Sequence, residues 1–200
     1  MRTEVKHSLS GSVIHTDAPK DHDGEGKDFA PTDLLASSLG TCVITIMGIE
    51  AKHCFSGSVI NTDAPKDHDG EWKDFALTDL LASSLGTCVI TIMAIEAKRR
   101  GWELGKIKID VYKTMTSEGP RKIKTLALEI FMPSELDYQK YQILKRTAED
   151  CPVKLNLEDS VDIKLNWHQT KIYKQKWFFG LFFNSLIIKK FFEWVSFYIV

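Results

Sequence analysis

A tandem duplication of 46 residues restricts the fold of this chain more than any other feature. Residues 6–51 and 52–97 align without gaps at an offset of 46, and only six positions differ. A solenoid of repeats needs at least three units. The repeat is therefore interpreted as a recent duplication of part of one domain, or as a fault in the assembly of the gene. Both copies should form the same local elements.

Each copy predicts a strand, a polar loop and a helix. The segment GSVI(H/N)T predicts the strand, and DAPKDHDGE predicts a turn-rich loop. In the second copy the helix is expected over residues 79–100, with Thr78 as its N-cap, because apolar residues recur at steps of three and four. The helix is apolar almost all round, which predicts burial between other elements.

The single-copy part of the chain predicts a sheet and a further helix. Alternating apolar residues predict strands over 106–115, 124–132 and 161–167. Ser134, with an acidic residue three positions later, resembles a capping box for a helix that reaches residue 150. These elements predict an α+β domain with a mostly antiparallel sheet, a long buried helix that carries a cysteine, and a second helix.

The four cysteines predict thiol chemistry rather than a zinc site or structural disulfides. Cys42, Cys54, Cys88 and Cys151 form no C-x-x-C pair, and the N-terminus has no apolar segment typical of a secretory signal. A cytoplasmic location, with no metal and no cofactor, is therefore expected. Pro152 places Cys151 at a helix N-terminus, where the helix dipole favours a thiolate. The alternative for Cys88 and Cys151 is a buried structural thiol.

Several segments together resemble the OsmC/Ohr family of thiol-dependent hydroperoxide reductases, and within it the OsmC-like branch that carries PTDLL. They are TDAPKD, PTDLLASSLGTC, PRKI and DCPVKLNL. The resemblance covers residues 1–167 apart from the extra copy. It implies an intertwined homodimer, an organic hydroperoxide as substrate and an external dithiol as reductant. It also implies that Cys88 is oxidised to a sulfenic acid, which Cys151 resolves as a disulfide.

The residues that would activate the thiolate depart from the family pattern. Family members carry a glutamate after the proline, paired with an arginine, whereas this chain has a threonine followed by Asp33 or Asp79. The resemblance therefore leaves Asp79, Lys66 and Arg121 as the possible activating residues. Cys42 and Asp33 are the equivalents of Cys88 and Asp79 in the first copy.

The expected organisation has three parts. Residues 1–51 are the extra copy, residues 52–168 are the OsmC-like domain, and residues 169–200 are an aromatic and lysine-rich tail outside that domain. The second copy is expected in the native position because it is joined directly to the remaining domain. The first copy could then pack on a dimer surface, exchange with a partner subunit or promote aggregation.

Charge and hydropathy exclude two further classes of partner. A net charge of −1 argues against a general nucleic-acid-binding protein. The longest uncharged run of the tail has 12 residues, short of the ~20 that span a bilayer, so membrane insertion is not expected. The sequence therefore predicts a hydroperoxide reductase. The alternative is an inactive OsmC-like protein, either a relic of the fold or a binder of small apolar ligands.

Overall fold

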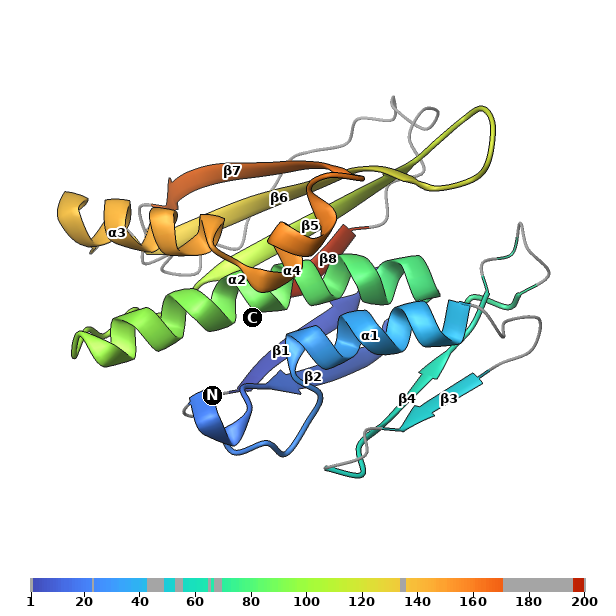
Figure 1. Ribbon diagram of the computed structural model, residues 1–200, viewed down its shortest axis with the longest axis horizontal. Coiled ribbons are helices and arrows are strands. Elements are labelled where there is room, and N and C mark those ends of the chain that lie inside the picture. The colour runs from blue at the N-terminus through green and yellow to red at the C-terminus, as the bar shows by residue number, and fades with distance from the viewer. Residues whose placement is uncertain are drawn as a thin grey trace, which may run out of the picture.

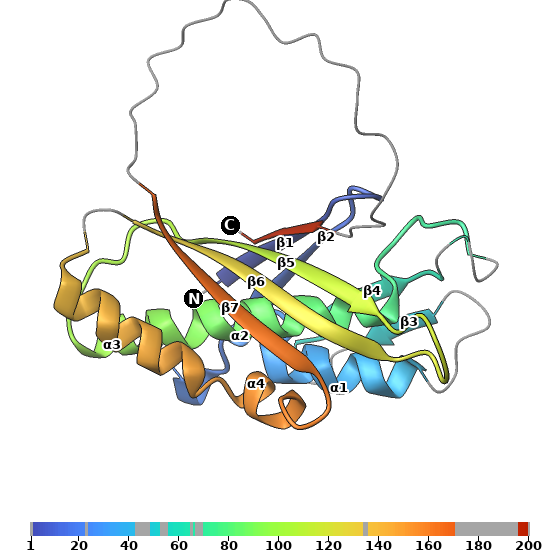
Figure 2. The same ribbon diagram turned by 90° about the horizontal axis from the view of Figure 1, so that it is seen from above.

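A computed structural model describes residues 2–22, 24–42, 49–52, 56–64, 66, 70–133, 136–170 and 196–199. Its main body has a sheet layer and a helical layer, which Figure 2 shows from above. The main sheet contains β1 (Arg2–His7), β2 (Val13–Asp17), β5 (Lys108–Met115), β6 (Ile123–Pro133), β7 (Asp162–Thr170) and β8 (Ser196–Ile199). The helices are α1 (Pro31–Cys42), α2 (Leu77–Arg99), α3 (Tyr138–Glu149) and α4 (Pro152–Leu157). This arrangement confirms the predicted α+β class.

The main sheet is mostly antiparallel, as the alternating segments predict. Its strand order is β2-β1-β8-β5-β6-β7, and of these pairs only β6 and β7 run parallel. Strand β8 belongs to residues 169–200, and it pairs with β1 on one side and with β5 on the other. The remainder of that tail, residues 171–195 and 200, lies outside the described residues.

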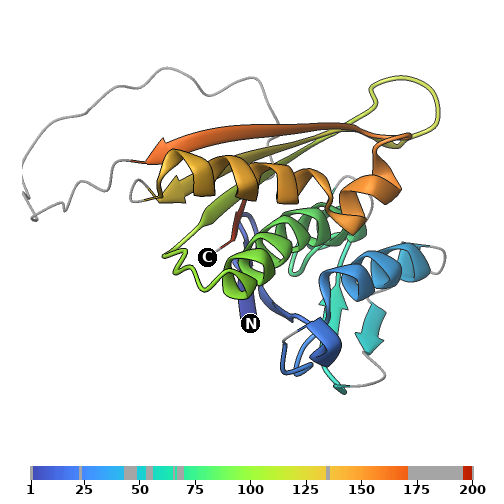
Figure 3. The ribbon, with the colours of Figure 1, turned by 60° about the vertical axis from the view of Figure 1, so that its left-hand side comes forward.

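Helix α2 is the central helix of the molecule. In Figure 3 it lies between α3 and α1, and it also contacts β5 and β6. By length and composition α2 could cross a membrane, but 72% of its most apolar window is buried inside the molecule. The prediction of a buried helix is confirmed, and α2 has the character of a core helix.

Two predicted helix starts are wrong by a few residues. Helix α2 begins at Leu77 with Ala76 as its N-cap, because the Asp79 side chain accepts the Ala76 backbone N–H at 3.2 Å. Helix α3 begins at Tyr138, and its N-cap is Asp137, which accepts the Lys140 N–H at 2.8 Å. The predicted cap of α3, Ser134, lies outside the described residues.

The two copies of the duplicated segment form the same local structure. Strands β3 (Ile49–Lys52) and β4 (Val59–Thr62) make a separate two-stranded sheet, whose register equals that of β1 and β2 shifted by 46. The bridge between Thr16 and Phe29 recurs between Thr62 and Phe75. A short 3-10 turn, η1 (Lys20–His22), lies between β2 and α1. Figure 1 shows α1 beside α2, with β3 and β4 at one end of the molecule.

Candidate functional site

The structure brings Cys88 and Cys151 together, although 63 positions separate them in the sequence. Cys88 lies in the middle of α2, and Cys151 is the N-cap of α4, which packs against α2. The side chains of Cys88 and Cys151 are close enough to hydrogen-bond to each other. Both cysteines are free and buried, so the contact joins two thiols that no disulfide links.

The surroundings of Cys151 favour its thiolate. The hydrogen bond from Cys88, together with the backbone N–H groups of Lys154 and Val153, lowers the pKa of the Cys151 thiol against the opposing effect of burial. The N–H groups belong to the first turn of α4, whose N-terminus carries positive potential. The sequence predicted this position for Cys151 from Pro152, and the helix start is confirmed.

Cys88 has the opposite preference. The hydrogen bond to Cys151 and, next, burial raise the pKa of the Cys88 thiol above its ordinary value. Cys151 is therefore the more acidic thiol of the pair, and Cys88 holds its proton more tightly. Cys88 is 4% exposed and Cys151 is 0% exposed, and both belong to the main hydrophobic core. The pair is a reduced dithiol in an apolar environment, and oxidation can join its sulfurs.

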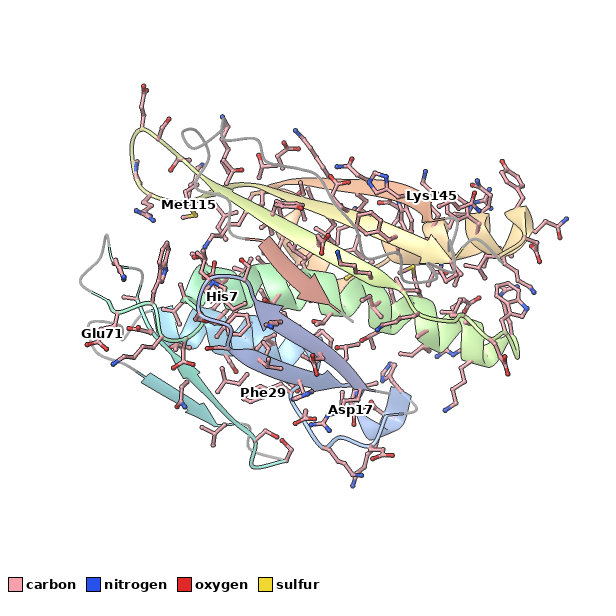
Figure 4. The ribbon with its side chains drawn as sticks, turned by 180° about the vertical axis from the view of Figure 1, so that it is seen from behind. His7, Asp17, Phe29, Glu71, Met115 and Lys145 are labelled. Carbon is pink, nitrogen blue, oxygen red and sulfur yellow. The ribbon has the colours of Figure 1, made fainter. Side chains whose placement is uncertain are left out.

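A second buried polar cluster lies at the N-terminus of α2. The Lys113 ammonium donates hydrogen bonds to the Asp79 carboxylate and, at 2.6 Å, to the Thr78 hydroxyl. His7 Nε2 lies 3.5 Å from Asp79 Oδ2, and Figure 4 shows His7 on β1 close to the start of α2. Burial, more than any nearby charge, lowers the pKa of His7. Asp79 therefore neutralises Lys113 and joins α2 to β5 and β1.

The sequence did not predict Lys113 or His7 as partners of Asp79. Lys113 follows Ile109 and Val111 at steps of two on β5, so it occupies the buried face of the strand. A lysine at an inward-facing position of an alternating strand predicts a buried charge that needs a partner, and this signal was available in the sequence. His7 gave no such signal, because its contact with Asp79 joins the first copy of the repeat to the second.

The remaining predicted site residues belong to other elements than the two thiols. Arg121 is exposed in the connection between β5 and β6. Lys66 is exposed in the loop of the second copy. Asp33 is half-buried at the start of α1 and accepts the Ala30 N–H at 3.2 Å. Cys42 is the last described residue of α1, and its side chain is outside the described atoms. Among the described residues, no three His, Cys, Asp or Glu side chains gather in a way that could hold a metal ion.

Comparisons with known proteins agree with this fold. The family model for OsmC-like proteins matches residues 74–166. A structure from Psychrobacter arcticus, described as an osmotic stress induced and detoxification response protein, is 34% identical with a TM-score of 0.56. The match covers 60% of this chain and 86% of that chain. No curated protein matches the sequence.

More distant structures share the fold alone. An OsmC-like protein from Mycoplasma pneumoniae is 16% identical with a TM-score of 0.52, covering 61% of this chain and 88% of that chain. An organic hydroperoxide resistance protein from Elizabethkingia anophelis is 17% identical with a TM-score of 0.50, covering 63% of this chain and 96% of that chain. The 34% identical relative, of which this chain covers 86%, together with the family model establishes that this chain belongs to the OsmC/Ohr family.

Proposed function

We propose that this protein reduces organic hydroperoxides, with Cys88 as the thiol that is oxidised and Cys151 as the thiol that resolves it. The observation that carries the proposal is the proximity of the two thiols in the core, where α4 packs against α2. The apolar surroundings of the pair suit an organic hydroperoxide better than hydrogen peroxide. Family membership and the name of the related Elizabethkingia protein point to the same substrate class.

The contact between the two thiols gives the oxidation a simple path. Cys88 is the residue of the pair with the larger exposed fraction, so we infer that an incoming hydroperoxide reaches it first. As the hydroperoxide arrives, the proton of Cys88 passes to Cys151, and the Cys88 thiolate attacks the outer peroxide oxygen. The O–O bond breaks, the alkoxide takes that proton from Cys151 and leaves as an alcohol, and Cys88 keeps one oxygen as a sulfenic acid.

The second step uses the lowered pKa of Cys151. Its thiolate attacks the Cys88 sulfenic sulfur, which forms the disulfide and releases hydroxide, and the hydroxide takes up a proton from solvent to become water. An external dithiol then attacks the Cys88 sulfur, and Cys151 leaves as the thiolate. A thiol with a lower pKa leaves faster in such an exchange. One hydroperoxide is thereby reduced to alcohol and water, and one dithiol is oxidised to a disulfide.

Asp79 and Lys113 serve a positioning role in this scheme. Asp79 precedes Cys88 by nine residues on α2, which places it about 13.5 Å away along the helix axis. The Asp79–Lys113 pair is too far away to accept the Cys88 proton. The Cys151 sulfur can accept it, because it lies next to the Cys88 thiol. Arg121 and Lys66 are exposed, and in this scheme they would act on the substrate outside the buried pair. A cytoplasmic location, where thiols stay reduced, belongs to the same proposal.

The test is an assay of cumene hydroperoxide consumption with a dithiol reductant, followed by mass mapping of the cysteines. We expect Cys88→Ser to lower turnover by at least about 1000-fold, as loss of a nucleophile does. Cys151→Ser should leave Cys88 as a sulfenic or sulfinic acid. Cys42→Ser is the matched control from the first copy, and it should keep the parent rate.

Two results would contradict the proposal. Full turnover by the Cys88→Ser variant would remove Cys88 from the reaction. Oxidised wild-type protein without a bond between Cys88 and Cys151 would remove the resolving step. Saturable binding of hydroperoxide without any consumption would instead support the alternative function, a binder of small apolar ligands.

A further inference from the structure

The two copies of the duplicated segment contact each other reciprocally. We call residues 2–42 the first unit and residues 49–99 the second unit. The Ser12 hydroxyl of the first unit donates to the Lys73 carbonyl at 2.8 Å and lies 3.0 Å from Asp74 Oδ1. The Ser58 hydroxyl of the second unit donates to the Lys27 carbonyl at 2.9 Å and lies 3.5 Å from Asp28 Oδ1. The two sets of contacts are related by the offset of 46.

The larger elements follow the same reciprocal rule. Strand β1 of the first unit packs against α2 of the second, and β3 of the second unit packs against α1 of the first. His7 belongs to the first of these contacts, through Asp79 and through its ring, which lies 5.1 Å from that of Phe75. Helices α1 and α2 pack together, and Figure 1 shows them running in opposite directions. The serine contacts and the strand–helix contacts occur in both directions, as a two-fold axis between the antiparallel helices would produce.

Reciprocal contacts of this kind are the signature of a symmetric dimer. In an isologous interface residue i of one subunit contacts residue j of the other, and j contacts i in return. Here both partners belong to one chain. We propose that the first unit takes the place that a second copy of this chain would occupy, so that the duplication creates an internal two-fold interface and the protein acts as a monomer.

Tethering favours the internal partner over a second chain. The connection between the described parts of α1 and β3 has six residues, 43–48, and can span at most about 20 Å. A short connection gives the attached partner an effective concentration in the millimolar range. The β1–β2 and β3–β4 hairpins are nearly identical in sequence. If one hairpin took the place of the other, the free energy would change little, because each would find the same contacts. A free second chain could compete only at comparable concentration.

The first unit also contributes to the surroundings of the thiol pair. Helix α1 packs against α4 as well as against α2, so it covers the short helix that begins at Cys151. Residues 98–170 occur only once, so the chain has one α4. In the described structure its Cys151 lies beside Cys88 of the second unit. The inferred assembly is therefore symmetric in its interface and asymmetric in its chemistry, with one redox pair in each chain.

The test places a cysteine pair across each of the two reciprocal contacts in the full-length protein. Ser12→Cys with Asp74→Cys forms one pair, and Ser58→Cys with Asp28→Cys forms the other. Each pair is oxidised or bridged with a short bifunctional maleimide, and peptide mapping locates the bond. We expect both pairs to link within one chain, so that the product runs as a single chain on a non-reducing gel. A link between two chains, or a link in only one of the pairs, would overturn the proposal.

Molar mass in solution gives a second measurement that needs no variant. Light scattering on the unmodified protein should report the mass of one chain, 22.7 kDa, across micromolar concentrations. The family resemblance implies a homodimer. A stable species of twice that mass would contradict the proposal that the first unit occupies the place of a second chain. The result is independent of hydroperoxide turnover, so failure of the proposed chemistry leaves it unchanged.

Discussion

Helices α1 and α2 begin with almost the same sequence and lie in very different environments. Residues 32–42 are identical to residues 78–88, yet Leu39 is 56% exposed and its equivalent Leu85 is 0% exposed. Asp33 is half-buried, whereas Asp79 is buried against Lys113. The difference shows that burial is a property of what packs on a helix. Strands β5 and β6 and helix α3, which pack on α2, come from a part of the chain that exists once.

Substitution of the two equivalent aspartates should give the largest difference in stability between the two helices. Asp79→Asn leaves the buried Lys113 ammonium without its counter-charge, and breaking a buried pair typically costs about 3–5 kcal/mol of unfolding free energy. Asp33→Asn should cost less than about 1 kcal/mol, the usual value of a charge at a helix N-terminus. Urea unfolding of both variants measures the difference. Equal losses would mean that the two helix starts have the same environment.

The equivalent leucines test the same contrast through packing alone. Leu85→Ala should lower the unfolding free energy by about 2–5 kcal/mol, because it leaves a cavity in the core. Leu39→Ala removes an exposed side chain and should change it by less than about 0.5 kcal/mol. Thermal and urea unfolding of the pair provide the measurement. A large loss from Leu39→Ala would show that another surface covers α1 in solution.

The reciprocal serines should show the smallest effects and, unlike the other pairs, equal ones. Ser12→Ala and Ser58→Ala each remove one hydroxyl that donates across the two units, with an expected cost of about 0.5–1.5 kcal/mol. The double variant should lose the sum of both. Chemical unfolding detects such changes, and a loss confined to one serine would argue against two-fold equivalence.

The local elements could be read from the sequence because they depend on neighbouring residues. The strands after residue 100 alternate with a period of two, and Pro152 marks the start of α4 behind Cys151. The starts of α2 and α3 were misplaced, since a different side chain satisfies the free backbone N–H groups in each case. Periodicity locates a helix, but the caps depend on competition among nearby polar side chains.

The sequence by itself determined the α+β class, the buried helix and the identity of the two candidate thiols. It could not determine whether the strands of each copy pack on the helix of the same copy or of the other copy, because both copies present nearly the same side chains. Only the tertiary structure paired β1 with α2 and β3 with α1, and placed Lys113 against Asp79. These contacts join residues far apart in the chain, so their geometry follows from packing rather than from local sequence.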